Sequence, residues 1–275
     1  MYTQLEQRHS PRPPVNLGTL QRMKAEGEKI AWLTAYDASF AMLVDMAGVD
    51  VVLVGDSLGM VIQGHETTVP VTMDDMVYHC RAVARGLGRP FMVADMPFMS
   101  YATREQALDN AVRLMQEGGA KMVKLESGGG QLGIVEFLAG HDIPVCAHIG
   151  LRPQSVHKVG GFRVQGREAE AAQQMVRDAR DLQNAGADIV LLECVPTGLG
   201  AEITRSLDAP VIGIGAGPDV DGQVLVLYDI LDLTTGRKPR FTRNFMECAA
   251  SPLAALEAYV RAVKDRSYPA PEHCF

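Results

Sequence analysis

The chain has 275 residues, of which 47% are hydrophobic and 21% are charged, and its formal net charge is −7. These proportions are those of an ordinary globular protein and exclude a disordered or fibrous chain. The acidic balance and the absence of any Lys/Arg-rich run argue against nucleic-acid binding. The sequence contains no uncharged run of roughly 18 apolar residues, the length that a membrane-spanning helix needs. The length fits either one large α/β barrel or two smaller domains.

The five cysteines are scattered along the chain without a CxxC pair. An odd number at such spacing suits neither a disulfide framework nor a zinc site, so we expect a reducing compartment. The N-terminus is polar and proline-rich and has no apolar signal segment. We therefore expect a cytoplasmic protein in which residues 1–20 form a flexible segment and residues 21–275 form one folded domain.

Eight short apolar runs follow one another along the chain. Their near-continuous apolarity is typical of strands that are buried on both faces, as in a parallel sheet. The runs cover residues 29–37, 50–56, 90–95, 121–126, 144–148, 188–193, 210–217 and 223–229.

Stretches with helical periodicity separate these runs. In residues 103–120, Thr103 followed by Gln106 resembles a capping box and Gly118 is the first of two glycines that form a stop signal. Residues 167–187 have a similar helical pattern. Eight strand–helix units in this length predict a (β/α)₈ TIM barrel, although a doubly wound open sheet would show the same local alternation.

Three successive runs end in an acid: Asp56, Asp95 and Glu126. In a TIM barrel the carboxyl ends of the strands form the active-site mouth, so these side chains should lie on neighbouring strands about 4.8 Å apart. Carboxylates this close stay ionised together only around a cation, and an all-oxygen set matches Mg²⁺. The alternative is that they are helix caps or solvated loop residues.

Other polar residues in the runs are also candidates for the site. Lys124 shares a strand face with Glu126 and could offer its charge to a substrate carboxylate, unless it is a surface lysine. Glu193 ends the sixth run among apolar neighbours that could raise its pKa towards general-base function, but capping or an ion pair is as common a role. His148 could donate a hydrogen bond to a metal ligand or be a weak ligand itself, but we expect a core histidine with satisfied hydrogen bonds.

The connection at residues 58–75 exceeds the usual length of about 2–6 residues, which predicts a lid or an interface loop. Residues 213–219, "GIGAGPD", resemble an anion-binding turn but lack the spacing of a dinucleotide site.

Seven motifs, taken together, closely resemble those of the ketopantoate hydroxymethyltransferase family. They occur in order and at the family's spacing, from about Thr34 to the terminal "YPAPEHCF". They are "AYDASFA", "VGDSLGMVIQGHETTVPVT", "ADMPFMSY", "MVKLE", "PVCAHIGLRPQS", "LLECVP" and "PVIGIGAG". Small departures are Glu66 and Thr67, where the family often has Asp and Ser, and they affect none of the candidate metal ligands.

The resemblance implies a (β/α)₈ enzyme of pantothenate synthesis, usually a homodecamer. Such an enzyme transfers the methylene group of 5,10-methylenetetrahydrofolate to 3-methyl-2-oxobutanoate, giving 2-dehydropantoate. By the family's motifs, Asp56, Asp95 and Glu126 would surround Mg²⁺, while Asp56, Ser57, Asp95 and Lys124 would contact the keto acid. Glu193 would accept the proton.

Two alternatives stay open at the level of sequence. One is a Mg²⁺-dependent 2-oxo acid lyase or phosphotransferase similar to isocitrate lyase or phosphoenolpyruvate mutase, which uses comparable barrels and enolate chemistry. Such enzymes usually carry a KxCG-like loop, which is absent here. The other is a non-catalytic barrel in which the acids are caps and the pocket only holds a ligand.

Overall fold

The computed structural model describes residues 13–236 and 238–275 and contains one closed barrel of parallel strands. Each strand pairs with the next along the chain, and the last pairs with the first, so that Ile30 lies opposite Gly222. The strands are β1 (Ile30–Thr34), β2 (Val51–Val54), β3 (Phe91–Asp95), β4 (Met122–Glu126), β5 (Val145–Gly150), β6 (Ile189–Glu193), β7 (Val211–Ile214) and β8 (Gly222–Leu225). The expected single-domain (β/α)₈ barrel is confirmed.

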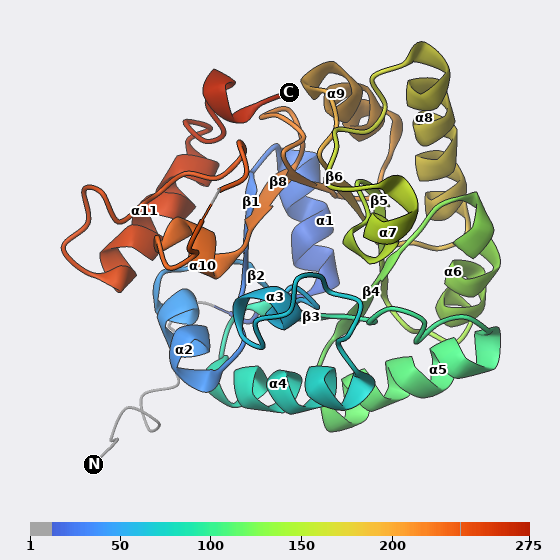
Figure 1. Cartoon of the computed structure of the whole chain (residues 1–275), viewed down its shortest axis with the longest axis horizontal. Helices are drawn as coiled ribbons and strands as arrows, with labels where there is room; N and C mark the ends of the chain where they lie inside the picture. The colour runs from blue at the N-terminus through green and yellow to red at the C-terminus, as the bar shows by residue number, and fades with distance from the viewer. Residues whose placement is uncertain (1–12, 237) are drawn as a thin grey trace.

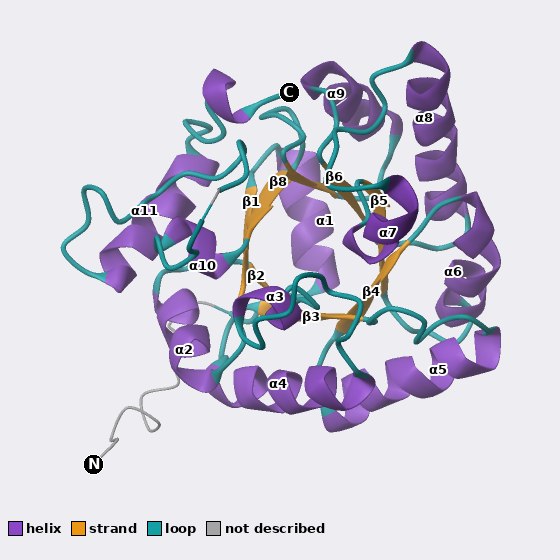
Figure 2. Cartoon of the chain, in the orientation of Figure 1, coloured by secondary structure: helices purple, strands orange, loops and turns teal. Residues whose placement is uncertain are grey.

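Helices surround the ring of strands, and short helices lie over its mouth (Figures 1 and 2). The helices are α1 (Leu17–Glu26), α2 (Ala38–Met46), α3 (Leu58–Val61), α4 (Met73–Gly86), α5 (Arg104–Val112), α6 (Leu132–Ala139), α7 (Val156–Val159), α8 (Ala169–Asn184), α9 (Thr197–Ser206), α10 (Leu227–Ile230) and α11 (Pro252–Lys264). Helix α5 continues as a π-helical turn, Arg113–Glu117, before β4.

The strands are shorter than several of the apolar runs. β1 ends at Thr34, and Asp37 instead caps α2 by accepting a hydrogen bond from the Phe40 backbone N–H at 2.9 Å. β8 ends at Leu225, so Asp229 lies in α10 rather than at a strand end. In both places the segment that leads to the next helix begins inside the apolar run: a turn before α2, and α10 itself after β8.

Two predicted local features hold only in part. The side chain of Thr103 does cap α5, but the Gln106 side chain accepts its hydrogen bond from Ala102 rather than from Thr103. The connection at residues 58–75 contains α3 and the first turn of α4, so only residues 62–72 form a loop.

Helix α1 closes the amino-terminal end of the barrel. It begins at Leu17, where the Asn16 side chain accepts a hydrogen bond from Thr19. Leu20 and Met23 are buried in the cluster that fills the barrel interior. Residues 13–20 therefore belong to the folded domain, which corrects that part of the flexible segment expected over residues 1–20; its first 12 residues lie outside those described.

Two apolar clusters hold the barrel together. The inner cluster comes from every second strand residue, such as Trp32 and Val93, and fills the barrel below its mouth. The outer cluster packs the intervening strand residues, such as Leu33 and Ala94, against the helices. Burial on both faces explains why the strands read as continuous apolar runs.

Across the described part of the chain, no helix combines the length and the apolarity that crossing a membrane requires. The five cysteines are free, and Cys80, Cys146 and Cys194 are buried.

Tyr259 of α11 ties the first and last strands together. Its buried hydroxyl lies 3.0 Å from the carbonyl oxygen of Trp32 on β1 and 2.9 Å from that of Gln223 on β8. The hydroxyl thus satisfies strand carbonyls that are shielded from water at the point where the barrel closes.

We expect Tyr259→Phe to lower the free energy of unfolding by about 1–2 kcal/mol, because the variant loses a buried hydroxyl donor in contact with two strand carbonyls. Urea unfolding followed by circular dichroism measures the change. The control is Tyr78→Phe on α4, where the side chain is 71% exposed, and its effect should stay within about 0.5 kcal/mol. Equal stability of the two variants would contradict the role given to Tyr259.

Candidate active site

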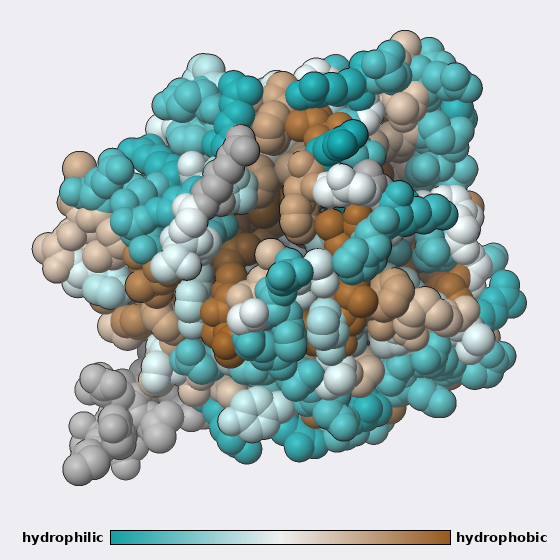
Figure 3. All heavy atoms as spheres, viewed as in Figure 1, coloured by the Kyte–Doolittle hydropathy of each residue, from teal (hydrophilic) through white to brown (hydrophobic). Residues whose placement is uncertain are grey.

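A cavity of about 1010 Å³ opens at the carboxyl ends of the strands. In Figure 3 it is the hollow at the centre of the face, with apolar residues on its walls and hydrophilic residues around it. All the side chains predicted from the sequence to form a site line this cavity: Asp56, Ser57, Asp95, Lys124, Glu126 and Glu193. The three acids that end successive apolar runs therefore line one mouth of the barrel.

The strand register explains why the acids meet. Asp95 is the last residue of β3 and is paired with Lys124 on β4, while Asp56 follows β2 by two residues. The backbone N–H of Asp56 donates a hydrogen bond of 3.0 Å to Asp95 Oδ2. The end of β2 is thus fixed directly to the side chain at the end of β3.

A buried ion pair lies at the centre of this cluster. Lys124 Nζ is 2.6 Å from Asp95 Oδ1, and both side chains are nearly inaccessible to solvent. Burial alone would lower the pKa of Lys124, but Asp95 and then Asp56 outweigh that effect and raise it. Lys124 is therefore a permanent cation among carboxylates, and its reading as a surface lysine is excluded.

Gln154, from the turn after β5, links three of the neighbouring strand ends. Its side-chain Nε2 donates to Asp56 Oδ2 at 2.8 Å and to the Met96 carbonyl at 3.0 Å. Its backbone N–H donates to Glu126 Oε1 at 2.9 Å, and its Oε1 accepts from the Tyr101 hydroxyl at 2.5 Å. One buried residue thus orients two of the three acids.

The hydrogen bonds leave the carboxylates only partly compensated. Burial, followed by the charge of Asp95, raises the pKa of Asp56 to about 7. Burial and then Asp56 raise the pKa of Glu126 well above its usual range. Among the described residues, Glu126 Oε2 has no hydrogen-bond partner although it is buried. The protein partners in the cluster therefore do not fully stabilise the ionised form of these carboxyl groups.

Within residues 13–236 and 238–275, no three His, Cys, Asp or Glu side chains already form a metal cage. The ion pair with Lys124 draws Asp95 to one side of the cluster, and Gln154 engages one oxygen of Asp56. The three acids nevertheless line one cavity, and an all-oxygen donor set of this kind suits a hard cation that keeps water ligands and leaves positions for a substrate.

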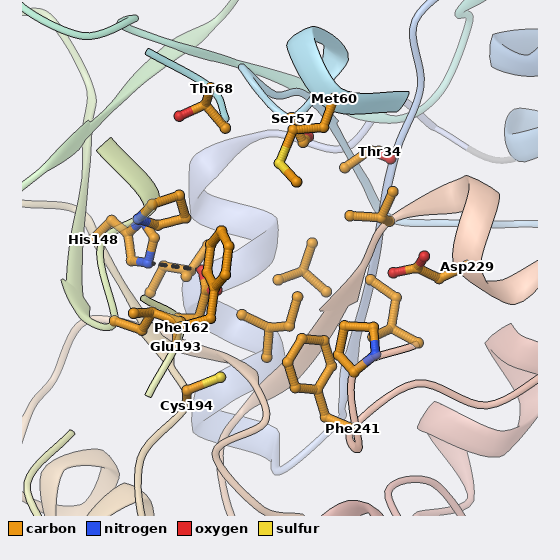
Figure 4. Close-up of a pocket in the computed structure, with 18 of the residues that line it drawn as sticks. Thr34, Ser57, Met60, Thr68, His148, Phe162, Glu193, Cys194, Asp229 and Phe241 are labelled. Atoms are coloured by element: carbon orange, nitrogen blue, oxygen red, sulfur yellow. Dashed lines mark ion pairs between the residues drawn. The ribbon is translucent and has the colours of Figure 1, made fainter. Parts of the chain in front are cut away.

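His148 and Glu193 form the neighbouring part of the cavity wall. His148 Nδ1 is 3.4 Å from Lys124 Nζ, and its Nε2 is 3.3 Å from Glu193 Oε2, the contact dashed in Figure 4. Burial and then Lys124 lower the pKa of His148, so its ring is neutral. Burial raises the pKa of Glu193 to about 7, where a carboxylate can accept a proton near neutral pH.

Gly150 allows β5 and β6 to approach at this point. Its φ is +93°, and a Cβ there would lie 2.3 Å from the carbonyl oxygen of Glu193. Only glycine adopts this conformation without strain and leaves room for the neighbouring backbone. The position of Glu193 beside His148 thus depends on a glycine at the end of β5.

The connection after β2 covers the same cavity. Ser57 Oγ lies 2.9 Å from the hydroxyl of Tyr36, and Met60 and the buried Thr68 line the pocket wall (Figure 4). The segment expected to be a lid is therefore in contact with the site. The turn at residues 213–219 contributes only Ile214 to the cavity lining.

Gln154 and Tyr36 are site residues that the sequence predictions missed. Neither is a charged residue at the end of an apolar run, which was the signal used for the acids. Gln154 could have been found from Pro153, which fixes a turn directly after β5, the same place relative to a strand that the acids occupy.

Comparison with known proteins identifies the family. A family model described as ketopantoate hydroxymethyltransferase matches residues 14–271. The chain belongs to the ketopantoate hydroxymethyltransferase family. Among curated relatives, a 3-methyl-2-oxobutanoate hydroxymethyltransferase of Alkalilimnicola ehrlichii is 61% identical and covers 96% of this chain and 95% of its own length. One of Nitrosococcus oceani is 62% identical, with 93% and 97% covered.

This membership confirms an enzyme, a hydroxymethyltransferase that transfers one-carbon units. Solved structures share its fold at low identity. A putative phosphonomutase from Burkholderia cenocepacia is 16% identical with a TM-score of 0.62, covering 78% of this chain and 94% of its own. A 2,3-dimethylmalate lyase of the PEP mutase/isocitrate lyase superfamily is 14% identical with a TM-score of 0.56, covering 76% and 80%. The lyase or phosphotransferase alternative thus agrees with the fold alone.

Proposed function

We propose that this ketopantoate hydroxymethyltransferase acts on 3-methyl-2-oxobutanoate and 5,10-methylenetetrahydrofolate. Its products are 2-dehydropantoate and tetrahydrofolate, and one water is consumed because a methylene group becomes a hydroxymethyl group. The observation that carries the proposal is the placement of a buried lysine, a cluster of acids and a separate high-pKa Glu193 around one cavity. These are the groups that enolisation of a 2-oxo acid requires.

The keto acid binds at the acid cluster in this proposal. Lys124 neutralises its carboxylate. Ser57, beside Asp56 and Asp95 at the end of β2, donates a hydrogen bond from its hydroxyl group to the keto acid. The cation of Lys124 is already oriented by Asp95 at 2.6 Å, so little reorganisation accompanies binding.

The same cluster fits Mg²⁺, held by Asp56, Asp95 and Glu126. Support comes from the buried, unpartnered Glu126 Oε2, from the raised pKa values of Asp56 and Glu126, and from an all-oxygen donor set. When bound, the ion acts as a Lewis acid that stabilises negative charge on the keto oxygen. Gln154 would keep two of these carboxylates in place, as outer partners of metal ligands do.

Glu193 is the proposed general base. It removes the proton from C3 of the keto acid, and the resulting enolate carbon forms the new bond to the methylene carbon of the donor. In the balanced reaction both carbon–nitrogen bonds of that methylene carbon break and water supplies the hydroxyl oxygen. The C3 proton and one proton of the water end on the two donor nitrogens, which gives tetrahydrofolate. The neutral ring of His148, at 3.3 Å, limits how far the Glu193 carboxyl can move. A cytoplasmic, homodecameric enzyme is also part of the proposal, on the family resemblance alone.

We expect Glu193→Gln to lower the rate of C3 proton exchange by roughly 10²–10⁴-fold, because the amide cannot accept the proton. The assay follows exchange of 3-methyl-2-oxobutanoate in deuterated water by proton NMR, with Mg²⁺ and without the folate donor. Keto-acid binding, measured by calorimetry, should remain.

The matched control is Glu202→Gln on the exposed side of α9, which should exchange at the wild-type rate. Undiminished exchange in Glu193→Gln would remove Glu193 from the base role. Absence of any exchange in the wild type would instead favour the non-catalytic binding barrel.

We expect the exchange rate of the wild type to rise with pH and to level off above about 7. Glu193 must be deprotonated to act as a base, and burial raises its pKa from an ordinary 4.5 to about 7. A raised pKa keeps the acid form present to higher pH, so activity is lost on the acidic side. The pH profile of exchange under saturating keto acid tests this, and a plateau reached already near pH 5 would contradict it.

We expect Gln154→Leu to weaken Mn²⁺ binding by roughly 10–100-fold, because Asp56 loses the amide donor that orients it. Titration of the substrate-free protein followed by electron paramagnetic resonance measures the affinity. The control is Gln174→Leu on the exposed face of α8, which should bind Mn²⁺ as the wild type does. Equal affinities in both variants would count against metal binding at this cluster.

A further inference from the structure

The cavity has a second side that the keto acid and its acid cluster leave unused. A small 2-oxo acid fills only part of about 1010 Å³. The same cavity is also lined by residues from the segment after β5 and from the chain beyond β8, which lie far apart in the sequence. Three of them are phenylalanines: Phe162, Phe241 and Phe275.

These aromatic rings are placed by the glycine-rich turn after β7. A Cβ at Gly215 would lie 2.9 Å from the ring of Phe241 and 3.0 Å from that of Phe275. The turn at residues 213–219, whose sequence resembles an anion-binding turn, therefore packs against two aromatic side chains. Phe162 is 55% exposed, and Figure 4 shows it and Phe241 beside the open middle of the pocket. An exposed ring at a pocket mouth is suited to contact a flat ligand.

Asp229 supplies a polar group on this side. Its side chain is 6% exposed, and Figure 4 shows its carboxylate directed into the pocket. Oδ1 accepts a hydrogen bond from the Thr234 hydroxyl at 2.6 Å, and a carboxylate can accept further bonds from a ligand. A heterocycle with adjacent N–H donors pairs well with such a group.

Three cations surround the outer part of the same side: Arg163, Lys238 and Arg240. Arg240 is held in place, since its guanidinium lies 5.6 Å from the centre of the Phe275 ring and its Nε donates to the Glu272 carbonyl at 2.9 Å. Lys238 pairs with Asp232. In a chain of net charge −7, cations gathered at a cavity mouth favour an anionic ligand group.

We infer that this side of the cavity binds the one-carbon donor, with its ring between Phe162 and Phe241 and against Asp229, and its anionic tail at Arg163, Lys238 and Arg240. The inference rests on the proposed function, which requires a donor bearing a heterocycle and glutamate carboxylates. The opposite orientation would bring those carboxylates to Asp56, Asp95 and Glu126, where the keto acid binds in the proposed function. With the tail directed outward, the ring of the donor lies in the cavity that Glu193 also lines.

The tail contacts are tested with a variant in which Arg163, Lys238 and Arg240 are each replaced by Gln. The Michaelis constant is measured for 5,10-methylenetetrahydrofolate with one and with four glutamates. We expect an increase of roughly fivefold or more for the monoglutamate, because exposed ion pairs each contribute modestly. The increase should be larger for the tetraglutamate, and in the wild type both constants should rise with salt.

The ring contacts are tested separately with Asp229→Asn and with Phe162→Ser, whose side chain is exposed enough for folding to be unaffected. Both should raise the Michaelis constant for the donor, and the effect should be the same for one and for four glutamates. The control is Arg22→Gln on α1, at the other end of the barrel, which should change neither constant.

C3 proton exchange of the keto acid in the absence of the donor distinguishes failure of the inference from failure of the proposed function. The inference is supported if the wild type exchanges the proton and the variants of the donor side exchange it at the same rate, while their Michaelis constants for the donor rise. If their donor constants equal those of the wild type, or if the constant for the keto acid rises instead, the inference is overturned while the proposed function stands. If the wild type neither exchanges nor transfers, the proposed function itself fails.

Discussion

The ion pair between Lys124 and Asp95 is the interaction on which the candidate site depends. A charge pair buried at 2.6 Å with little solvent access is stable only if further polar groups complete its environment. Here Asp56 and Glu126 add two further carboxyl groups, and the backbone of Asp56 donates to Asp95. The cluster is therefore fixed in position, and Glu126 Oε2 still has no hydrogen-bond partner among the described residues, which is the feature that the proposed cation site uses.

The barrel provides this arrangement through simple geometry. Parallel strands place all their carboxyl ends at one mouth, and a register that sets Asp95 beside Lys124 brings neighbouring end residues into contact. Burial of the strands on both faces then raises the pKa values of acids at the rim of the core. The chemistry thus follows from where each strand stops, which explains why apolar runs that end in acids carried so much information.

The cavity combines two chemically distinct sides. The ends of β2 to β4 supply the buried lysine and the three acids to which the proposed enolisation is assigned, and β6 supplies Glu193. The chain beyond β8 and the segment after β5 supply aromatic rings, one buried carboxylate and cations. This division matches a reaction with two substrates of different size and charge, and it gives a reason for the long connections that close this end of the barrel.

The sequence alone determined the fold class, the family and the six candidate residues, because strand order fixes which ends are neighbours. It also overextended several strands, at Asp37 and Asp229, since an apolar run does not record where hydrogen bonding between strands stops. Only the tertiary structure brought in Gln154 and the contact of His148 with Glu193. Those contacts join residues far apart in the chain, and their partners are set by how the loops pack over the mouth rather than by any local pattern.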